Sequence, residues 1–260
     1  MKILMIGDVS SCVGRDALFE YSERGFLGAD IVIANVENAA HGRGVTRGVY
    51  AELERTGVHG YTLGNHIWDC SDINYIFRFN DNIIRPYNLE GDVPGNGYMI
   101  LKSASGIRVG VISLIGRVNV TMPLSQNPFL AADRAIEKLR GSCDVIAVDF
   151  HAEATSEKLS LGYYLDGRVG IVAGTHTHVQ TADAHVMPKG TGYITDLGMT
   201  GPAVSVLGMD RKTVIERFCK NIPRRLEPAT GSGQFCACMF DIDENTGLAR
   251  GATPIFDRFN

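Results

Sequence analysis

Several short apolar runs of this sequence are each followed directly by a side chain that can bind a metal ion. The donors are carboxylates, amides and imidazoles, without a thiolate: Asp8, Glu37, Asn38, Asn65, His66, His151, His176 and His178. Oxygen and nitrogen donors of this kind suit iron, manganese or zinc, and they disfavour copper(I) or a structural zinc site rich in cysteine. The residue types therefore predict a metal centre.

The number of these donors indicates more than one ion. A ligand set of this size exceeds what one tetrahedral ion takes. Two ions roughly 3.5–4 Å apart, bridged by one carboxylate, would use the surplus, and such pairs act on phosphate esters. A dinuclear centre is therefore the hypothesis that this set favours.

Some of these residues also have an ordinary structural interpretation. Taken singly, Asp8 is better explained as a helix cap and Glu37-Asn38 as a loop turn. The pairs Asn65-His66 and His176-x-His178 are stronger evidence, because such pairs in loops are uncommon unless they bind metal or transfer protons. The remaining histidines are assigned to the surface or to satisfied core positions: His41, His59 and His185.

The elements that must position these residues follow from the pattern of apolar residues. Buried strands are expected at Lys2–Gly7, Asp30–Val36, Gly60–Leu63, Arg108–Leu114, Asp144–Phe150 and Arg168–Gly174. Helices are expected between them at Arg15–Arg24, Arg47–Arg55, Ser71–Phe79, Ala131–Arg140 and Ser156–Leu165. This alternation predicts a layered α/β fold. Because ligands bind beyond the carboxyl ends of the strands in such sheets, the polar residues that follow the strands are expected to converge.

The pattern changes after Thr175 to shorter strands and turns. Strands are expected at His185–Met187, Tyr193–Thr195, Phe235–Ile242 and Ala252–Phe256, with one helix near Arg211–Lys220. We expect these strands to form a second sheet that packs on the first. No linker or low-complexity tract separates the two halves, so residues 1–260 are predicted to form a single domain.

Composition excludes several classes of protein. The net charge is −4, with 25 Lys and Arg against 29 Asp and Glu and no basic run, so neither nucleic acid nor a membrane surface is the expected partner. The longest later apolar run, Val109–Gly116, is far too short to span a bilayer. The 6 cysteines form no Cys-x-x-Cys pair, which favours reduced thiols in the cytoplasm. Cys236 and Cys238 are expected to pack in the core.

The same residues resemble the calcineurin-like metallophosphoesterases, and more closely their YmdB-like branch. The blocks that carry the resemblance run through most of the chain, from residue 6 to about 208: Gly7-Asp8-Val9, Asn35-x-Glu37-Asn38-Ala39-Ala40, Gly64-Asn65-His66-x-Trp68-Asp69, the segment 149–158 that begins Asp149-Phe150-His151, the segment 174–183 that begins Gly174-Thr175-His176-Thr177-His178, and the segment 193–202 that begins Tyr193-Ile194-Thr195-Asp196.

The resemblance implies a four-layer α/β/β/α sandwich of two packed mixed sheets flanked by helices. It also implies two metal ions per chain, with iron as the expected metal and manganese or zinc as alternatives. The implied activity is hydrolysis of small phosphodiesters, with 2′,3′-cyclic nucleotides as the leading substrates and 3′,5′-cyclic AMP as a further candidate. Carried over by position, the first ion would be held by Asp8, Glu37, Asn38 and His178, and the second by Glu37, Asn65, His151 and His176.

Two departures from the wider family pattern stand near these ligands. Ser10 occupies a position where a histidine is usual, and the bridging residue is Glu37 where an aspartate is usual. Asn38 is expected to supply the missing ligand, as in the YmdB-like branch. The loop Ser10-Ser11-Cys12-Val13 also differs from the small turn usual in that branch, so its contacts to substrate stay open.

The resemblance makes His66 the general acid that protonates the departing ribose hydroxyl. Asp69 either orients His66 or caps the helix expected at Ser71–Phe79. Three arginines are candidates for contacts to phosphate, although a solvated surface role is as well supported for each: Arg15, Arg43 and Arg117.

Two other functions remain open at this point. The same site would suit a phosphatase that acts on phosphoproteins or other phosphomonoesters. A non-catalytic regulator that binds metal is the second alternative, and the pair Asn65-His66 argues against it, because a structural metal site needs no proton donor. Assembly into a homo-oligomer is compatible with the sequence and is not determined by it.

Overall fold

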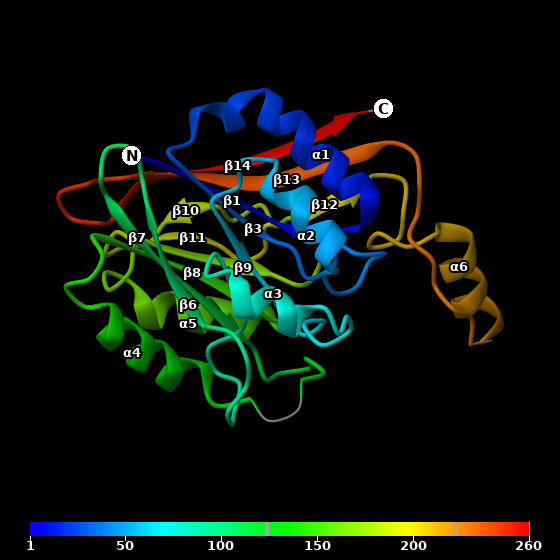
Figure 1. The fold of residues 1–260 in the computed structure, drawn as a ribbon, viewed down its shortest axis with the longest axis horizontal. Helices are drawn as coiled ribbons and strands as arrows, with labels where there is room; N and C mark the ends of the chain where they lie inside the picture. The colour runs from blue at the N-terminus through cyan, green and yellow to red at the C-terminus, as the bar shows by residue number, and fades with distance from the viewer. Residues whose placement is uncertain (123–124, 222, 260) are drawn as a thin grey trace.

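The computed structural model describes residues 1–122, 125–221 and 223–259, and its strands form two mixed sheets (Figure 1). The 8-stranded sheet has the order β2(Asp8–Val9), β12(Met199–Pro202), β13(Gly233–Ile242), β1(Lys2–Ile6), β3(Ile31–Asn35), β4(Gly60–Thr62) and β5(Ile83–Ile84), with β14(Ala249–Phe259) paired to β13. The 6-stranded sheet has the order β10(His185–Val186), β11(Gly192–Ile194), β9(Ile171–Thr175), β8(Val145–His151), β7(Arg108–Ile115) and β6(Tyr98–Lys102).

Helices cover the outer faces of the two sheets. In Figure 1 the first helices lie over the sheet that contains β1, and α4 and α5 lie under the other sheet. The first group comprises α1(Ser11–Glu23), the 3₁₀ turn η1(Gly25–Gly28), α2(Arg47–Glu54) and α3(Ile73–Phe79). The second comprises α4(Pro128–Leu139) and α5(Thr155–Leu165), whereas α6(Arg211–Lys220) projects from one side of the molecule. The predicted α/β/β/α order of layers is confirmed.

The core has three parts, which correspond to the spaces between these layers. Between the two sheets, Ile3 and Ile33 of one sheet pack with Val111 and Ala147 of the other. The outer faces bury separate clusters against the helices. Strands such as β3, which are buried on both faces, therefore appear in the sequence as continuous apolar runs.

Most of the predicted elements are present with shifted ends. The segment Arg211–Lys220 is helical over its full predicted length because the Asp210 side chain accepts a hydrogen bond from the Thr213 N–H and caps it. The edge strand β6 and the short strand β12 were not predicted from the pattern. Cys236 and Cys238 are buried, as expected, and burial raises the pKa of each thiol to about 12.

The expectation that the strands after Thr175 form a second sheet of their own is wrong. β13 pairs antiparallel with β1, so the end of the chain completes the first sheet. β10 and β11 instead extend the other sheet beside β9. The apolar pattern indicates that a strand is buried, but the choice of partner depends on contacts between segments far apart in the sequence.

None of the helices in the described part of the chain is both long enough and apolar enough to cross a membrane.

Candidate metal centre

The predicted metal ligands lie at one edge of the molecule, where the carboxyl ends of strands from both sheets meet. Asp8 lies in β2, Glu37 and Asn38 follow β3, and Asn65 follows β4. From the second sheet, His151 ends β8, and two further ligands follow β9, namely His176 and His178. The side chains that the sequence placed on separate strands are therefore neighbours in space.

Ring nitrogen Nε2 of His151 is the centre of the first group of donors. It lies 2.9 Å from Oε1 of Glu37, 3.0 Å from Oδ1 of Asn65 and 3.0 Å from Nδ1 of His176. One ring hydrogen cannot satisfy three such neighbours, since each of them presents a lone pair. Glu37, His151 and His176 have ligand atoms within 4.8 Å of one another, a spacing that fits a metal ion.

The hydrogen on the other ring nitrogen of His151 is fixed by buried neighbours. The Thr175 hydroxyl donates its one hydrogen to Oδ1 of Asp149 at 2.7 Å, so it can only accept from Nδ1 of His151, which lies 2.9 Å away. Nδ1 therefore carries a hydrogen, and Nε2 is the atom that can bind a cation. Groups that orient a ligand in this way are typical of metal sites.

A second group of donors surrounds Asp8. Its Oδ1 atom is buried and has no hydrogen-bond partner among the described residues, and it lies 3.9 Å from Nε2 of His178. Oδ1 of Asn38 lies 3.3 Å from the same nitrogen. The other oxygen of Asp8 accepts a hydrogen bond from the His176 N–H. A buried carboxylate oxygen without a partner is unfavourable unless a cation or another group satisfies it. The residues present thus fit a bound cation.

The charges within the centre also suit a cation. Burial raises the pKa of Asp8 to about 6, although His178 and His151 oppose that shift. Burial opposes the charge of Glu37 as well, but His151 and His66 lower the pKa of this carboxyl to about 2. Burial and the proximity of His151 lower the pKa of His176 to about 3, so its ring is neutral and keeps a lone pair.

In the chain without metal, the surroundings of His151 favour its protonated form. Burial disfavours the imidazolium form of His151, but Glu37 and the other buried carboxylates raise its pKa to about 9. A hydrogen on Nε2 of this imidazolium would point toward Oε1 of Glu37, which lies 2.9 Å away. A cation bound at Nε2 would have to displace it, so metal binding at this site is expected to release a proton.

Gly64 leaves the room that these side chains need. A Cβ atom at this position would lie 2.3 Å from Cδ2 of His151 and 2.5 Å from Oε2 of Glu37. Only glycine allows the chain before Asn65 to approach the two ligands so closely.

The loop that carries His176 and His178 is held by a buried ion pair that the sequence did not reveal. Nζ of Lys158 lies 2.5 Å from Oδ2 of Asp196 and donates to the Thr175 carbonyl at 2.7 Å. Asp196 in turn accepts a hydrogen bond from the Thr177 N–H. His176 and His178 both have positive φ, of 102° and 63°, a conformation that is strained for residues other than glycine. The ion pair therefore stabilises the loop against this strain. The sequence signal for this ion pair was the presence of a lysine and an aspartate at positions where apolar residues are usual.

His66 borders the ligands without being part of the close group. Its backbone N–H donates to Oε2 of Glu37, and its Nδ1 lies 2.9 Å from Oδ2 of Asp69. Asp69 does not cap α3, which begins at Ile73 with Asp72 at the cap position. The helix-cap alternative is thus wrong for Asp69, and it is also wrong for Asp8, because α1 begins after Ser10.

A cavity of about 560 Å³ opens above the ligands. The polar part of its lining includes Glu37, Asn38, His66, Glu153, His176 and His178. The apolar part of the lining comes from a segment to which no site residue was assigned from the sequence: Val206, Leu207, Met209, Val214, Phe218 and Leu226. The site therefore combines polar donors with an apolar surface.

Of the three arginines considered for phosphate, Arg43 lines this cavity. Arg15 is used elsewhere, since it pairs with Glu52 at 2.7 Å and donates to the Ala39 carbonyl. Arg117 lies in a loop in which its backbone N–H donates to Glu157. The other histidines, His41, His59 and His185, are exposed, as predicted.

The order of layers and the donors at the strand ends define a metallophosphoesterase. A family model described as YmdB-like protein matches residues 4–255, and the chain belongs to that family. The chain is 47% identical over 254 residues to the 2′,3′-cyclic-nucleotide 2′-phosphodiesterase of Bacillus subtilis (strain 168), an alignment that covers 96% of this chain and 94% of the relative.

Solved structures agree with this assignment. A hypothetical protein from Thermus thermophilus is similar with a TM-score of 0.92 and 37% identity, over 99% of both chains. A novel phosphatase from Mycoplasma pneumoniae is similar with a TM-score of 0.91 and 33% identity, over 99% of this chain and 93% of the other.

Proposed function

We propose that this chain hydrolyses 2′,3′-cyclic nucleotides at a centre of two metal ions. The observation that carries the proposal is the convergence of acidic, amide and imidazole donors around the unpartnered oxygen of Asp8. The identity of 47% to a 2′,3′-cyclic-nucleotide 2′-phosphodiesterase, over nearly the full length of both chains, supports this choice of substrate.

In this proposal Glu37 would contribute to the binding of both ions. The first ion would be held by Asp8, Glu37, Asn38 and His178, and the second by Glu37, Asn65, His151 and His176. When bound, such a pair of cations would supply a hydroxide nucleophile near neutral pH and neutralise charge on the phosphate oxygens. Iron as the resident metal and the cytoplasm as location stay predictions of the sequence.

His66 acts as the proton donor. Asp69 holds Nδ1 of its ring at 2.9 Å, which leaves Nε2 to give a proton to the ribose oxygen that departs from phosphorus. Following the name of the Bacillus relative, we expect the bond to the 2′ oxygen to break, so that a nucleoside 3′-monophosphate is the product. The apolar wall around Leu207 and Phe218 offers the nucleoside a surface on which to pack.

The first test is elemental analysis of protein purified without added metal, followed by turnover of 2′,3′-cyclic AMP before and after chelation. About two metals per chain and turnover that is lost on chelation would support the proposal. Release of phosphate from a phosphopeptide with no turnover of cyclic nucleotides would favour the phosphatase alternative. A metal-loaded chain that hydrolyses no phosphodiester would favour the non-catalytic regulator.

The second test is His66→Ala. We expect this variant to keep its metal and to lose about 10²–10⁴-fold in kcat, because it lacks only the proton donor. His185→Ala is the matched control, since His185 is exposed and lies outside the cavity. Turnover at the rate of the unchanged protein in His66→Ala would remove His66 from this role. Chromatography of the product, with 2′- and 3′-AMP as standards, would identify the bond that breaks.

A further inference from the structure

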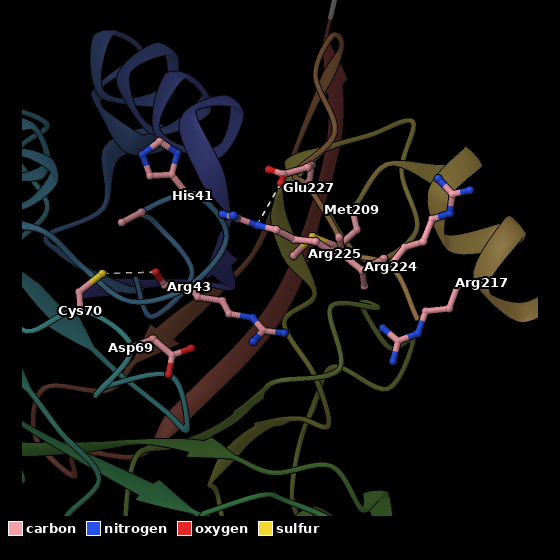
Figure 2. A pocket seen from close by; sticks show the side chains of 11 residues that line it. His41, Arg43, Asp69, Cys70, Met209, Arg217, Arg224, Arg225 and Glu227 are labelled. Carbon is pink, nitrogen blue, oxygen red and sulfur yellow. Dashed lines mark hydrogen bonds and ion pairs between the residues drawn. The ribbon is translucent and has the colours of Figure 1, made fainter. Parts of the chain in front are cut away.

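A second cavity, of about 760 Å³, shares lining residues with the cavity over the metal ligands. Figure 2 shows the side chains that line this second cavity. Its charged lining consists of four arginines, Arg43, Arg217, Arg224 and Arg225, and two carboxylates, Asp69 and Glu227. Both cavities are lined by Arg43, Met209, Arg217 and Leu226, so a ligand can extend from one into the other. The rest of the chain gives no reason to expect this concentration of positive charge, because the net charge is −4.

Two of these arginines have their charge available for a ligand. Arg224 and Arg225 each pair with a nearby glutamate, at 3.6 Å and 3.1 Å. No ion pair involves Arg43 or Arg217 in the part of the chain that the structure describes. Figure 2 shows the guanidinium groups of Arg43 and Arg217 extending from opposite walls toward the same space.

These two arginines reach the cavity from unrelated parts of the fold. Arg43 belongs to the loop between β3 and α2, only a few residues after the predicted ligands Glu37 and Asn38. Arg217 belongs to α6, the helix that projects from the side of the molecule. A solvated arginine on its own needs no ligand, but two guanidinium groups that have no ion-pair partner among the described residues and face the same space favour an anion placed between them. Guanidinium groups bind phosphate oxygens with two parallel hydrogen bonds.

We infer that Arg43 and Arg217 bind a second phosphate of the substrate, so that the preferred substrate is a 2′,3′-cyclic phosphate that carries a further phosphate on its 5′ side. This inference rests on the proposed function. A cyclic mononucleotide has one phosphate, which the metal centre takes, and the first cavity alone is within the range of size of common ligand pockets. The second cavity then provides a place for the additional phosphate. Two kinds of molecule carry both phosphates: a 2′,3′-cyclic mononucleotide that is phosphorylated at its 5′ oxygen, and an oligoribonucleotide whose 3′ end is a 2′,3′-cyclic phosphate.

The kinetic test measures the turnover of three substrates by the metal-loaded chain. They are adenosine 2′,3′-cyclic phosphate, its 5′-phosphorylated form, and the dinucleotide ApA that ends in a 2′,3′-cyclic phosphate. We expect kcat/KM to be about tenfold or more higher for at least one substrate with the second phosphate, because hydrogen bonds between charged groups are the strong ones. The better of the two identifies the source of the phosphate. Equal values for all three would overturn the inference.

Variants assign this preference to the arginines. In Arg43→Gln and Arg217→Gln, the ratio of kcat/KM between the doubly and the singly phosphorylated substrate should fall toward one. Arg211→Gln is the matched control, since Arg211 is an exposed arginine of the same helix that lines neither cavity. A ratio that stays at the value of the unchanged protein in both Arg43→Gln and Arg217→Gln would contradict the assignment.

A binding experiment separates this inference from the proposed function. Calorimetry with the metal-loaded chain would compare adenosine 3′,5′-bisphosphate with adenosine 3′-monophosphate, neither of which needs to react. We expect the bisphosphate to bind about tenfold or more tightly, and the difference to disappear in the variant that combines Arg43→Gln with Arg217→Gln. Equal Kd values in the unchanged protein would exclude the second site. If the chain hydrolyses none of the cyclic substrates, the proposed function fails, and the two Kd values still decide whether the second site exists.

Discussion

At the scale of single residues, the position of one hydrogen on His151 depends on a buried network. Thr175 and two further donors, Thr62 and Asn35, give hydrogens to Asp149, so this carboxyl acts as an acceptor although burial raises its pKa. Because the Thr175 hydroxyl donates its hydrogen to Asp149, its oxygen can only accept a hydrogen bond from His151. The network thus presents Nε2 of the ring to the candidate metal site without any contact of its own with the metal.

Thr175→Val tests this network while it keeps the shape of the side chain. We expect metal affinity to fall about 10–100-fold, because His151 would lose the acceptor that fixes its tautomer and its orientation. Titration of the metal-free protein with Mn²⁺ measures the change. Thr253→Val is the control, since Thr253 is exposed on β14 and does not line the cavity over the ligands. An affinity equal to that of the unchanged protein would show that the network does not assist metal binding.

At the scale of elements, the loop after β9 is held in place by two residues from neighbouring elements, Lys158 and Asp196. Lys158 comes from α5, and Asp196 follows β11. Both side chains are almost completely buried, with 1% and 0% exposure. A buried charge that loses its partner is strongly unfavourable, so each of the two residues requires the other.

Lys158→Met leaves Asp196 as an uncompensated buried charge. We expect the free energy of unfolding to fall by about 3–5 kcal/mol, as measured by denaturant titration. The double variant Lys158→Met with Asp196→Asn should recover part of this loss, because the unpaired charge is then gone. If the single variant is as stable as the unchanged protein, or if the double variant is the less stable of the two, the ion pair does not hold the loop in the manner described.

At the scale of the whole molecule, the two ends of the chain are combined in one sheet. β1 lies between β13 and β3, with Lys2 opposite Asp241 and Ile6 opposite Ala237. The core between the sheets includes residues from the beginning, the middle and the end of the chain, such as Ile3, Val145 and Phe240. A fragment that lacks either end of the chain would therefore lose strands of the sheet that contains β1.

We propose from this arrangement that residues 1–260 unfold as one cooperative unit. Differential scanning calorimetry of the metal-free chain should show a single transition, in which the calorimetric and van't Hoff enthalpies agree. The same midpoint should be found by circular dichroism and by intrinsic fluorescence. Two resolved transitions would contradict the prediction and would indicate that the halves fold separately.

The chemical class of the site was accessible from the sequence because it depends on residue types at strand ends. His151 and His176 follow apolar runs that are buried strands, and the edge where parallel strands end is shared by all of them. The roles of Asp8 and Asp69 were undecided, because a carboxylate before a helix has the same sequence pattern whether it caps that helix or faces a site. The structure excludes the helix cap in both cases, because it places the helix starts elsewhere, and the roles of these residues in the site stay proposals.

The sequence by itself determined most of the buried strands, the donors that follow them, and hence the layered fold and a centre suited to metal. The tertiary structure alone decided that β13 joins β1, that Lys158 meets Asp196, and that Arg43 and Arg217 face one cavity. The reason is the range of the forces involved. Periodicity of apolar residues records the local burial of each segment, whereas strand pairing, buried ion pairs and shared cavities arise between residues that only the packed chain brings together.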